Sequence, residues 1–479
     1  MIVAAAMRAV AVLAVGVLCT ALTLTCLDPP GARAGVGGRD PAFGAGGLVS
    51  TPLDTASRSR VELGVGPDGS AMVGDPAGYL LRFGPDGAPD TAFGAGGKFI
   101  LGRDPLSEGV EERALHPSNF VVDGAGRLLI FGGESDSRRG YRVPNSSATT
   151  GEPLTALESR AVALRFTEEG EPDPTFGSGS GFVRSSFGLR SQFPTDIPLI
   201  DALTGMVDSE DRPVLIAGAE AIALGCNAGG LTSYPRAVVR LTEAGEIDRS
   251  FSGNGVIPLT GSTDSPTLGI DASNRPGVRV GPYLRPELNC RAGTALVRLR
   301  ADGQLVRRFG ERGSRTFGEL LRLALVAPSG AMILTHRDGR TLEVVRIGLS
   351  GRRDKRFGHN GTARVRLPVA VGAHVMPVAV DAHGRILLAG FLGSSDPNPL
   401  PNSGVPEHPS LAVARLLPDG RMDFAFGERG WIIDRVPEPL EVGSTAATLD
   451  PQGRLLIAAT VTAPDQSQGG YLLARYLLG

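Results

Sequence analysis

The sequence is poor in the residue types on which many catalytic and nucleic-acid-binding sites depend. Its 479 residues include one Trp, four Cys and six His, and aromatic residues make up only 5%. This aromatic content argues against a platform on which nucleic-acid bases stack. The net charge is −2, and no long basic run occurs. A nucleic acid or an anionic membrane therefore has no electrostatic support as a partner.

Motifs of known catalytic and metal-binding sites are missing as well. The sequence holds no HExxH or other metal-ligand spacing, and no nucleophile elbow, P-loop or Rossmann fingerprint in a suitable context. We therefore expect no cofactor and no metal. An enzyme whose site is built from scattered loop residues would leave no such motif, so it stays an alternative. The six histidines are scattered: His116, His336, His359, His374, His383 and His408.

Residues 1–34 have the features of an export signal. Arg8 precedes a long apolar run, and "GARA" places small residues before a cleavage point near Ala34. The sequence thus predicts a secreted or cell-envelope protein whose mature chain has no membrane span. The length of the apolar run leaves an uncleaved anchor as one alternative. Lipid attachment at Cys26 is another, although Thr25 stands where a small Gly or Ala is preferred.

Two cysteines remain in the predicted mature chain. Cys226 and Cys290 fall in equivalent loops of successive repeats, and an exported chain can oxidise such a pair. We consider two interpretations, a Cys226–Cys290 disulfide and two small buried thiols. The stretch "GCNAGG" around Cys226 superficially resembles the surroundings of a nucleophilic cysteine, but the matching loop position of Cys290 favours a structural role.

Glycine and proline are abundant, and a repeated phrase organises them. The chain has 67 Gly and 36 Pro with 20% charged residues, a composition typical of many short strands and tight turns. A Phe followed by Gly or Ser recurs seven times, and a strand-like phrase such as "YLLRFGPDG" or "VARLLPDG" precedes six of these copies. The seven residues are Phe43, Phe93, Phe176, Phe251, Phe309, Phe357 and Phe426.

The ends of the chain divide one repeat between them. The seventh copy of the phrase is "LLARYLLG" at the C-terminus, whereas the first Phe-Gly pair, "DPAFGAGG", has no phrase before it. A hairpin-like element such as "VVDGAGRLLIFGG" also occurs seven times. A closed ring explains this division, because pairing of the two ends in one sheet leaves no edge open. Residues 35–479 therefore predict an all-β, seven-bladed β-propeller closed by its N- and C-terminal strands.

These repeats resemble the delta-60 repeat family of bacterial β-propellers. The resemblance rests on the succession of a strand, an Asp-Gly turn, "D-x-x-F-G-x-x-G" and "V-D-x-x-G-R-L-L-I-A-G", and it extends over nearly all of residues 40–479. The repeats are also similar, more loosely, to NHL-type propeller repeats. The resemblance implies a propeller fold and carries no catalytic residue, because a repeat and not an activity defines the family.

Each repeat carries an Arg and an Asp eight residues apart. A three-residue Pro-Asp-Gly turn places Arg82 opposite Asp90, and the same offset joins Arg415 to Asp423. We interpret these pairs as structural, because a residue that every blade needs does not mark a single active site. In the fifth repeat Val306 stands at the Asp position, so we expect Arg298 to lack the cross-strand carboxylate and to matter least among the repeated arginines.

Long insertions distinguish the repeats from one another. They follow the second strand in the second, third and sixth blades, and all of them are expected on one face of the ring. Such a face is commonly the binding face. The alternative is that these loops have lengthened without a function, because solvent-exposed loops tolerate insertions. The candidate binding residues are Arg138, Arg139, Tyr141, Tyr234, Arg236, Asn402, Glu407 and His408.

We therefore predict an exported, monomeric, non-enzymatic scaffold that binds a protein, peptide or glycan through this loop-built face. The alternative is an exported lyase or hydrolase that acts on a saccharide or a peptide-like substrate in the central funnel.

Overall fold

Short antiparallel strands make up the regular structure of the described part of the chain, and no helix occurs there. The computed structural model describes residues 37–51, 60–101, 113–136, 159–189, 200–219, 236–259, 266–285, 291–369, 372–393, 408–463 and 468–479. These residues belong to one compact unit, Gly35–Gly479. The predicted signal, residues 1–34, lies outside them. Among the described residues, no helix is long and apolar enough to cross a membrane.

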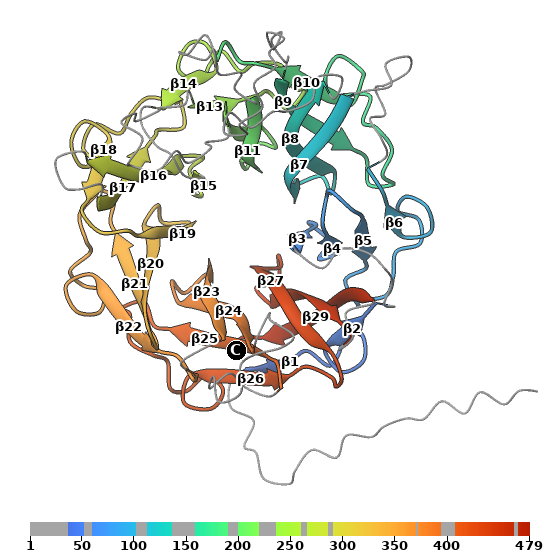
Figure 1. The fold of residues 1–479 in the computed structure, drawn as a ribbon, viewed down its shortest axis with the longest axis vertical. Helices are drawn as coiled ribbons and strands as arrows, with labels where there is room; N and C mark the ends of the chain where they lie inside the picture. The colour runs from blue at the N-terminus through green and yellow to red at the C-terminus, as the bar shows by residue number, and fades with distance from the viewer. Residues whose placement is uncertain are drawn as a thin grey trace, which may run out of the picture. The chain divides into compact units, whose positions relative to one another are not determined.

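Seven antiparallel blades follow one another around a ring, each with its first strand nearest the centre (Figure 1), and the pairing of Asp201 with Gly133 joins blades two and three into one sheet. Blade one holds β3 (Glu62–Val65), β4 (Ala71–Gly74), β5 (Leu80–Phe83) and β6 (Lys98–Phe99). Blade two holds β7 (Arg113–Val122), β8 (Leu128–Asp136), β9 (Ser159–Phe166) and β10 (Phe182–Ser185). Blade three holds β11 (Ile200–Val207), β12 (Pro213–Ala219), β13 (Arg236–Arg240) and β14 (Val256–Leu259).

The remaining blades repeat this order. Blade four holds β15 (Thr267–Ile270), β16 (Pro276–Arg285), β17 (Arg291–Arg298) and β18 (Ser314–Phe317). Blade five holds β19 (Arg322–Val326), β20 (Met332–Asp338), β21 (Thr341–Ile347) and β22 (Thr362–Arg366). Blade six holds β23 (Ala373–Val380), β24 (Ile386–Leu392), β25 (Ser410–Leu416) and β26 (Trp431–Arg435). The divergent stretch "NRPGVRV" of blade four thus contributes to a regular strand, β16.

Blade seven is assembled from both ends of the chain, as predicted. It holds β27 (Glu441–Leu449), β28 (Leu455–Thr462) and β29 (Gly469–Leu477), and its outer edge is made by β1 (Gly38–Arg39) and β2 (Leu48–Ser50). Gly38 lies opposite Leu477, and Leu48 lies opposite Ala474. In Figure 1 the blue N-terminal strands lie against the red C-terminal strand. The prediction of a seven-bladed propeller closed by its terminal strands is confirmed.

The core of the protein is distributed between the blades. Seven clusters of buried apolar side chains occur in the described residues, and each combines residues of two successive blades. The cluster that closes the ring packs Phe43 and Leu473 of blade seven against Val73 of blade one. Burial of apolar surface stabilises a fold by about 25 cal/mol per Å². Because every blade shares its buried surface with both neighbours, the blades depend on one another for stability.

The repeated turn has the geometry that the sequence predicts. In blade one the Gly84 amide donates to the Ala88 carbonyl over 2.8 Å, and the turn between them contains Gly87 at φ +84°. A Cβ at that position would lie 2.8 Å from Val49 of the preceding blade. Position 87 therefore requires glycine for two reasons, the left-handed backbone conformation and the close approach of two blades.

The repeated Arg side chains connect each blade to the next. Arg165 is buried, its Nε lies 2.7 Å from Asp173 Oδ2, and its guanidinium stacks 4.6 Å from the centre of the Phe176 ring. Its Nη1 donates to the Glu243 carbonyl in the turn of blade three. The same link joins Arg82, Arg240, Arg346 and Arg475 to a turn carbonyl of the following blade, and Arg415 to the carbonyl of Leu478 at the C-terminus. The seven repeated Phe side chains are buried, with at most 1% of their surface exposed.

Arg298, which ends β17 in blade four, lacks the cross-strand carboxylate, as expected, but it has another carboxylate partner. Val306 stands at the usual Asp position, but Arg298 Nη2 donates instead to Asp271, in the turn between β15 and β16. Asp271 also accepts from Arg275 Nε over 2.8 Å. The missing cross-strand carboxylate is therefore replaced by one from the inner hairpin of the same blade, and Arg298 remains buried with 2% of its surface exposed.

Candidate functional site

The predicted loop-built face lies mostly outside the described residues. This applies to Arg138, Arg139, Tyr141, Tyr234, Asn402 and Glu407, and also to Cys226 and Cys290. Two of the candidate binding residues are described. Arg236 begins β13 and is buried, with 2% of its surface exposed, so it is not available as a surface-binding residue. His408 is partly exposed, and its Nδ1 lies 3.2 Å from Glu438 Oε1.

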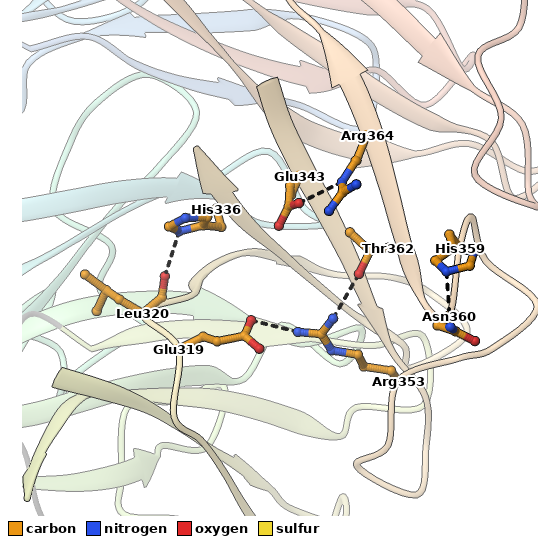
Figure 2. A pocket seen from close by; sticks show the side chains of 9 residues that line it. All are labelled: Glu319, Leu320, His336, Glu343, Arg353, His359, Asn360, Thr362 and Arg364. Atoms are coloured by element: carbon orange, nitrogen blue, oxygen red, sulfur yellow. Dashed lines mark hydrogen bonds and ion pairs between the residues drawn. The ribbon is translucent and has the colours of Figure 1, made fainter. Parts of the chain in front are cut away.

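A polar cleft lies at the boundary between blades four and five, and neither of the two described candidate binding residues of the loop-built face lines it. Its volume is about 570 Å³. Figure 2 shows its wall, in which β20 contributes His336, β21 contributes Glu343 and β22 contributes Arg364. The connection from β18 to β19 supplies Glu319 and Leu320, and the turn region before β22 supplies Arg353, His359 and Asn360.

Strand register explains why these side chains share a wall. His336 lies directly opposite Glu343, which lies directly opposite Arg364, and directly opposite residues of antiparallel strands project from the same face of the sheet. Leu334 and Val345, two residues away along β20 and β21, pack into the core cluster between blades four and five. Because side chains alternate along a strand, His336 and Glu343 face the same boundary as those core residues.

This polar row breaks the internal symmetry of the ring. The cross-strand pair equivalent to His336–Glu343 is apolar in five other blades: Gly132–Val162, Ala217–Ala237, Val280–Ala295, Gly390–Ala412 and Ala459–Leu472. In blade one the equivalent residues are Asp75 and Tyr79. Among the seven blades, only blade five places an imidazole beside a carboxylate at this position, and the two side chains line the cleft at the boundary with blade four.

Contacts among the lining residues hold the polar groups in place. Arg364 Nε donates to Glu343 Oε1 over 2.9 Å. Arg353 bridges two elements, since its Nη2 donates to Glu319 Oε2 over 2.7 Å and its Nη1 donates to Thr362 Oγ1 over 3.0 Å. Each arginine is thus already paired with a carboxylate. The arrangement offers hydrogen-bond donors and acceptors fixed in orientation, which is what recognition of a polar ligand requires.

The imidazoles of the cleft are less constrained. His336 Nδ1 lies 3.3 Å from the Leu320 carbonyl, and His359 Nε2 lies 3.4 Å from Asn360 Nδ2. Both rings are exposed. No hydrogen bond joins His336 to Glu343 among the contacts of the described residues, because that carboxylate is directed to Arg364 (Figure 2). The cleft therefore lacks an assembled His–carboxylate pair for general acid–base catalysis.

The sequence analysis did not identify this site, because a single polar residue within one strand is a weaker signal than a long insertion. The signal is present in the alignment of repeats, where a charged residue interrupts an otherwise apolar position of the third strand. Recognising it requires the register between strands, which decides that His336 and Glu343 are partners. No group of three or more His, Cys, Asp or Glu side chains able to hold a metal occurs among the described residues.

One carboxyl at an inner strand has a displaced pKa. Glu62 begins β3, the innermost strand of blade one, and its Oε2 accepts a hydrogen bond of 2.8 Å from the Phe120 amide of blade two. Burial raises the pKa of Glu62 to about 7, against the opposing effects of Arg60 and the Phe120 amide, and Asp75 adds to the rise. A single such group, without a neighbouring base or nucleophile bonded to it, is explained as a link between two blades.

Glu62 predicts a pH dependence of stability. The native state keeps the Glu62 proton up to about pH 7, whereas the unfolded chain loses it near pH 4.5. The stabilisation is therefore complete below the unfolded pKa and is lost as the pH rises through 7. Relative to Glu62→Gln, the native protein should lose on the order of 3 kcal/mol of unfolding free energy between pH 4 and pH 8. Denaturant unfolding at both pH values measures this, and parallel losses in the two proteins would contradict it.

Comparisons with known proteins leave the activity open. No family model and no curated protein matches the sequence. The structure is similar to the β-propeller domain of Cps50 (Swd1) from Myceliophteria thermophila, with 10% identity over 88% of this chain and 99% of that chain and a TM-score of 0.37. It is also similar to polysaccharide lyase Uly1, with 9% identity over 86% of this chain and 88% of that chain and a TM-score of 0.39.

A third similar structure is an intramolecular trans-sialidase from Ruminococcus gnavus, with 10% identity over 88% of this chain and 95% of that chain and a TM-score of 0.34. These identities and TM-scores are too low to assign a function to this chain. The names include enzymes as well as a propeller domain, so the comparisons do not distinguish a scaffold from an enzyme.

Proposed function

We propose that this protein is an exported, non-enzymatic propeller of the delta-60 repeat type that binds a protein, peptide or glycan, and that the cleft between blades four and five holds the ligand. The observation that carries the proposal is the His336–Glu343 pair. A polar pair at a position that is apolar in most blades reduces the packing between blades. Stability of the fold therefore does not explain the pair, whereas binding of a ligand does.

A variant that restores the apolar pattern tests this proposal. His336→Ala combined with Glu343→Ala reproduces the Ala217–Ala237 pair of blade three. We expect unfolding free energy to stay within about 1 kcal/mol of the native value or to rise, because functional polar groups are commonly kept at a cost in stability. Binding to a printed array of oligosaccharides and peptides should fall at least tenfold for the members that the native protein retains.

Two matched variants make the result specific. Arg421→Ala combined with Asp419→Ala removes an exposed ion pair of blade six that belongs to neither candidate surface, and should leave binding unchanged. Trimming residues 135–157 and 394–408 to short Gly-containing turns tests the loop-built face. If the trimmed protein loses array binding while the cleft variant keeps it, the ligand binds on the insertion face and the cleft assignment is wrong.

The enzyme alternative rests on Glu62, whose raised pKa is a property shared with catalytic acids. In that interpretation the protein acts on a saccharide or a peptide-like substrate at the funnel end of β3. Incubation of the native protein with the retained array members, followed by mass spectrometry, separates the two functions. Unchanged ligand masses support a scaffold, whereas cleavage that Glu62→Gln abolishes supports the enzyme.

A further inference from the structure

Positive charge is concentrated in one part of the ring although the whole chain is slightly acidic. Residues 300–366 contain 15 of the 48 Lys and Arg residues but only 6 of the 50 Asp and Glu residues, which gives this segment a charge of +9. The segment runs from the end of β17 in blade four to the end of β22 in blade five. The charge of this segment is not obvious from the sequence, because the basic residues are dispersed along its turns and strands and form no long run.

Several of these basic side chains line two hollows in the surface. The first, of about 1000 Å³, lies between blades three and four and is lined by Arg307, Arg308 and Arg312 together with Ser252 and Gln304. The second, of about 630 Å³, is lined by Arg315, Arg352 and Lys355. We call these six exposed cations the basic wall. The second hollow shares Glu319, Arg353 and Asn360 with the polar cleft, so the two adjoin each other.

The cations of the basic wall are not neutralised by the protein. Among the described residues none of the six forms an ion pair, and all are exposed. By contrast, Arg353 and Arg364 in the adjoining cleft are each paired with a glutamate. Arg315 is supported by the face of Phe317, 5.5 Å from the ring centre. Unpaired cations in a recess raise the local concentration of anions, and their attraction for a polyanion is not offset by neighbouring carboxylates.

We propose that the basic wall binds an anionic polysaccharide, whose chain extends from the first hollow through the second into the polar cleft. This deepens the function proposed above, on which it rests, by naming the class of ligand. Carboxylate or sulfate groups would pair with the arginines. Sugar hydroxyls would meet the neutral donors and acceptors beside them, such as Gln304, Thr316 and Asn360.

The chemistry of the hollows favours a glycan over other polyanions. Phe317 is the single aromatic residue that lines either hollow, so stacked bases of a single-stranded nucleic acid find no platform. The cations also line recesses, which a flat anionic membrane cannot enter. The two sources of negative charge on a glycan, carboxylate and sulfate, remain to be distinguished by experiment.

Binding of defined polymers to the full mature chain tests the proposal. Polygalacturonate, dextran sulfate and neutral dextran serve as probes, with a single-stranded DNA oligonucleotide and phosphatidylglycerol vesicles as the competing classes. We expect binding of at least one acidic polysaccharide, weakening as salt is added, and none of dextran. Preference for polygalacturonate or for dextran sulfate identifies the anionic group. Equal or tighter binding of DNA or of vesicles would overturn the glycan assignment.

Charge-matched variants assign the surface. Arg307→Gln, Arg308→Gln and Lys355→Gln together should weaken binding at least tenfold. Arg421→Gln, Arg429→Gln and Arg435→Gln remove three exposed cations of blade six and should change it less than twofold. Equal losses in both triple variants would mean non-specific attraction and overturn the proposal. Unchanged melting temperatures of both triple variants show that folding is not the cause.

The cleft variant separates this inference from the function on which it rests. If His336→Ala with Glu343→Ala abolishes array binding but the native protein binds no acidic polysaccharide, the basic-wall proposal fails and the cleft proposal stands. If the acidic polysaccharide binds the cleft variant as well as the native protein, but not the basic-wall variant, the basic wall is the site and the cleft proposal fails.

Discussion

Removal of residues 471–479 should unfold all seven blades together. The deletion takes away most of β29, the strand to which β28, β1 and β2 all pair. It also removes Arg475, whose Nε lies 2.9 Å from Asp40 Oδ2 and whose guanidinium stacks over Phe43. Both core clusters that flank blade seven lose members, including Leu472 and Leu473. Since blades share their cores with their neighbours, the loss is not confined to one end.

The expected result is the absence of a cooperative melting transition in the truncated chain. A circular permutant provides the control. Gly479 joined directly to Gly37, with new ends opened between residues 145 and 146, keeps every strand of blade seven. Gly38 lies opposite Leu477, so the junction closes a short hairpin like those of the other blades. The permutant should melt within a few degrees of the native chain. A truncated chain that melts as the native one does would contradict closure through the terminal strands.

Replacement of Arg415 by Ala should cost about 3–5 kcal/mol, as loss of one partner from a buried ion pair commonly does. Arg415 is buried, and its Nε lies 2.8 Å from Asp423 Oδ2. The substitution leaves the buried Asp423 carboxylate with the Ala425 amide, 3.2 Å away, as its remaining side-chain contact. It also removes the link to the Leu478 carbonyl of blade seven and the stacking on Phe426.

Arg298→Ala should cost less, about 1–2 kcal/mol. Its partner Asp271 keeps the Arg275 guanidinium and accepts from the Ser273 and Arg275 amides over 2.9 and 3.0 Å. Denaturant unfolding measures both costs. A double-mutant cycle of Arg298→Ala with Asp271→Asn should give a coupling energy above zero. Arg421 forms an exposed ion pair with Asp419, so Arg421→Ala should lower the free energy of unfolding by less than about 0.5 kcal/mol. An equal or larger cost at Arg298 than at Arg415 would contradict this account.

The ring itself could be predicted because its determinants are local and are repeated seven times. The Pro-Asp-Gly turn sets the hairpin register within about ten residues, and the register alone places Arg82 opposite Asp90, where the structure has the two side chains 3.0 Å apart. Closure could be predicted for a similar reason. The missing phrase before Phe43 and the missing turn after Arg475 belong to one repeat, and only pairing of the two ends completes it.

The functional surface could not be predicted in the same way, because its determinants are differences between blades and contacts between distant strands. Arg298 meets Asp271 from another hairpin, and Arg236 is buried by its position in β13 rather than exposed on a loop. His336 and Glu343 form a pair only because β20 and β21 align them toward blade four. The positive charge of residues 300–366 can be counted from the sequence. Only the structure shows that six of these basic side chains are exposed and form no ion pair with another described residue. Short-range geometry thus determined the architecture, whereas only the packing of one blade against the next decided which side chains are available to a ligand.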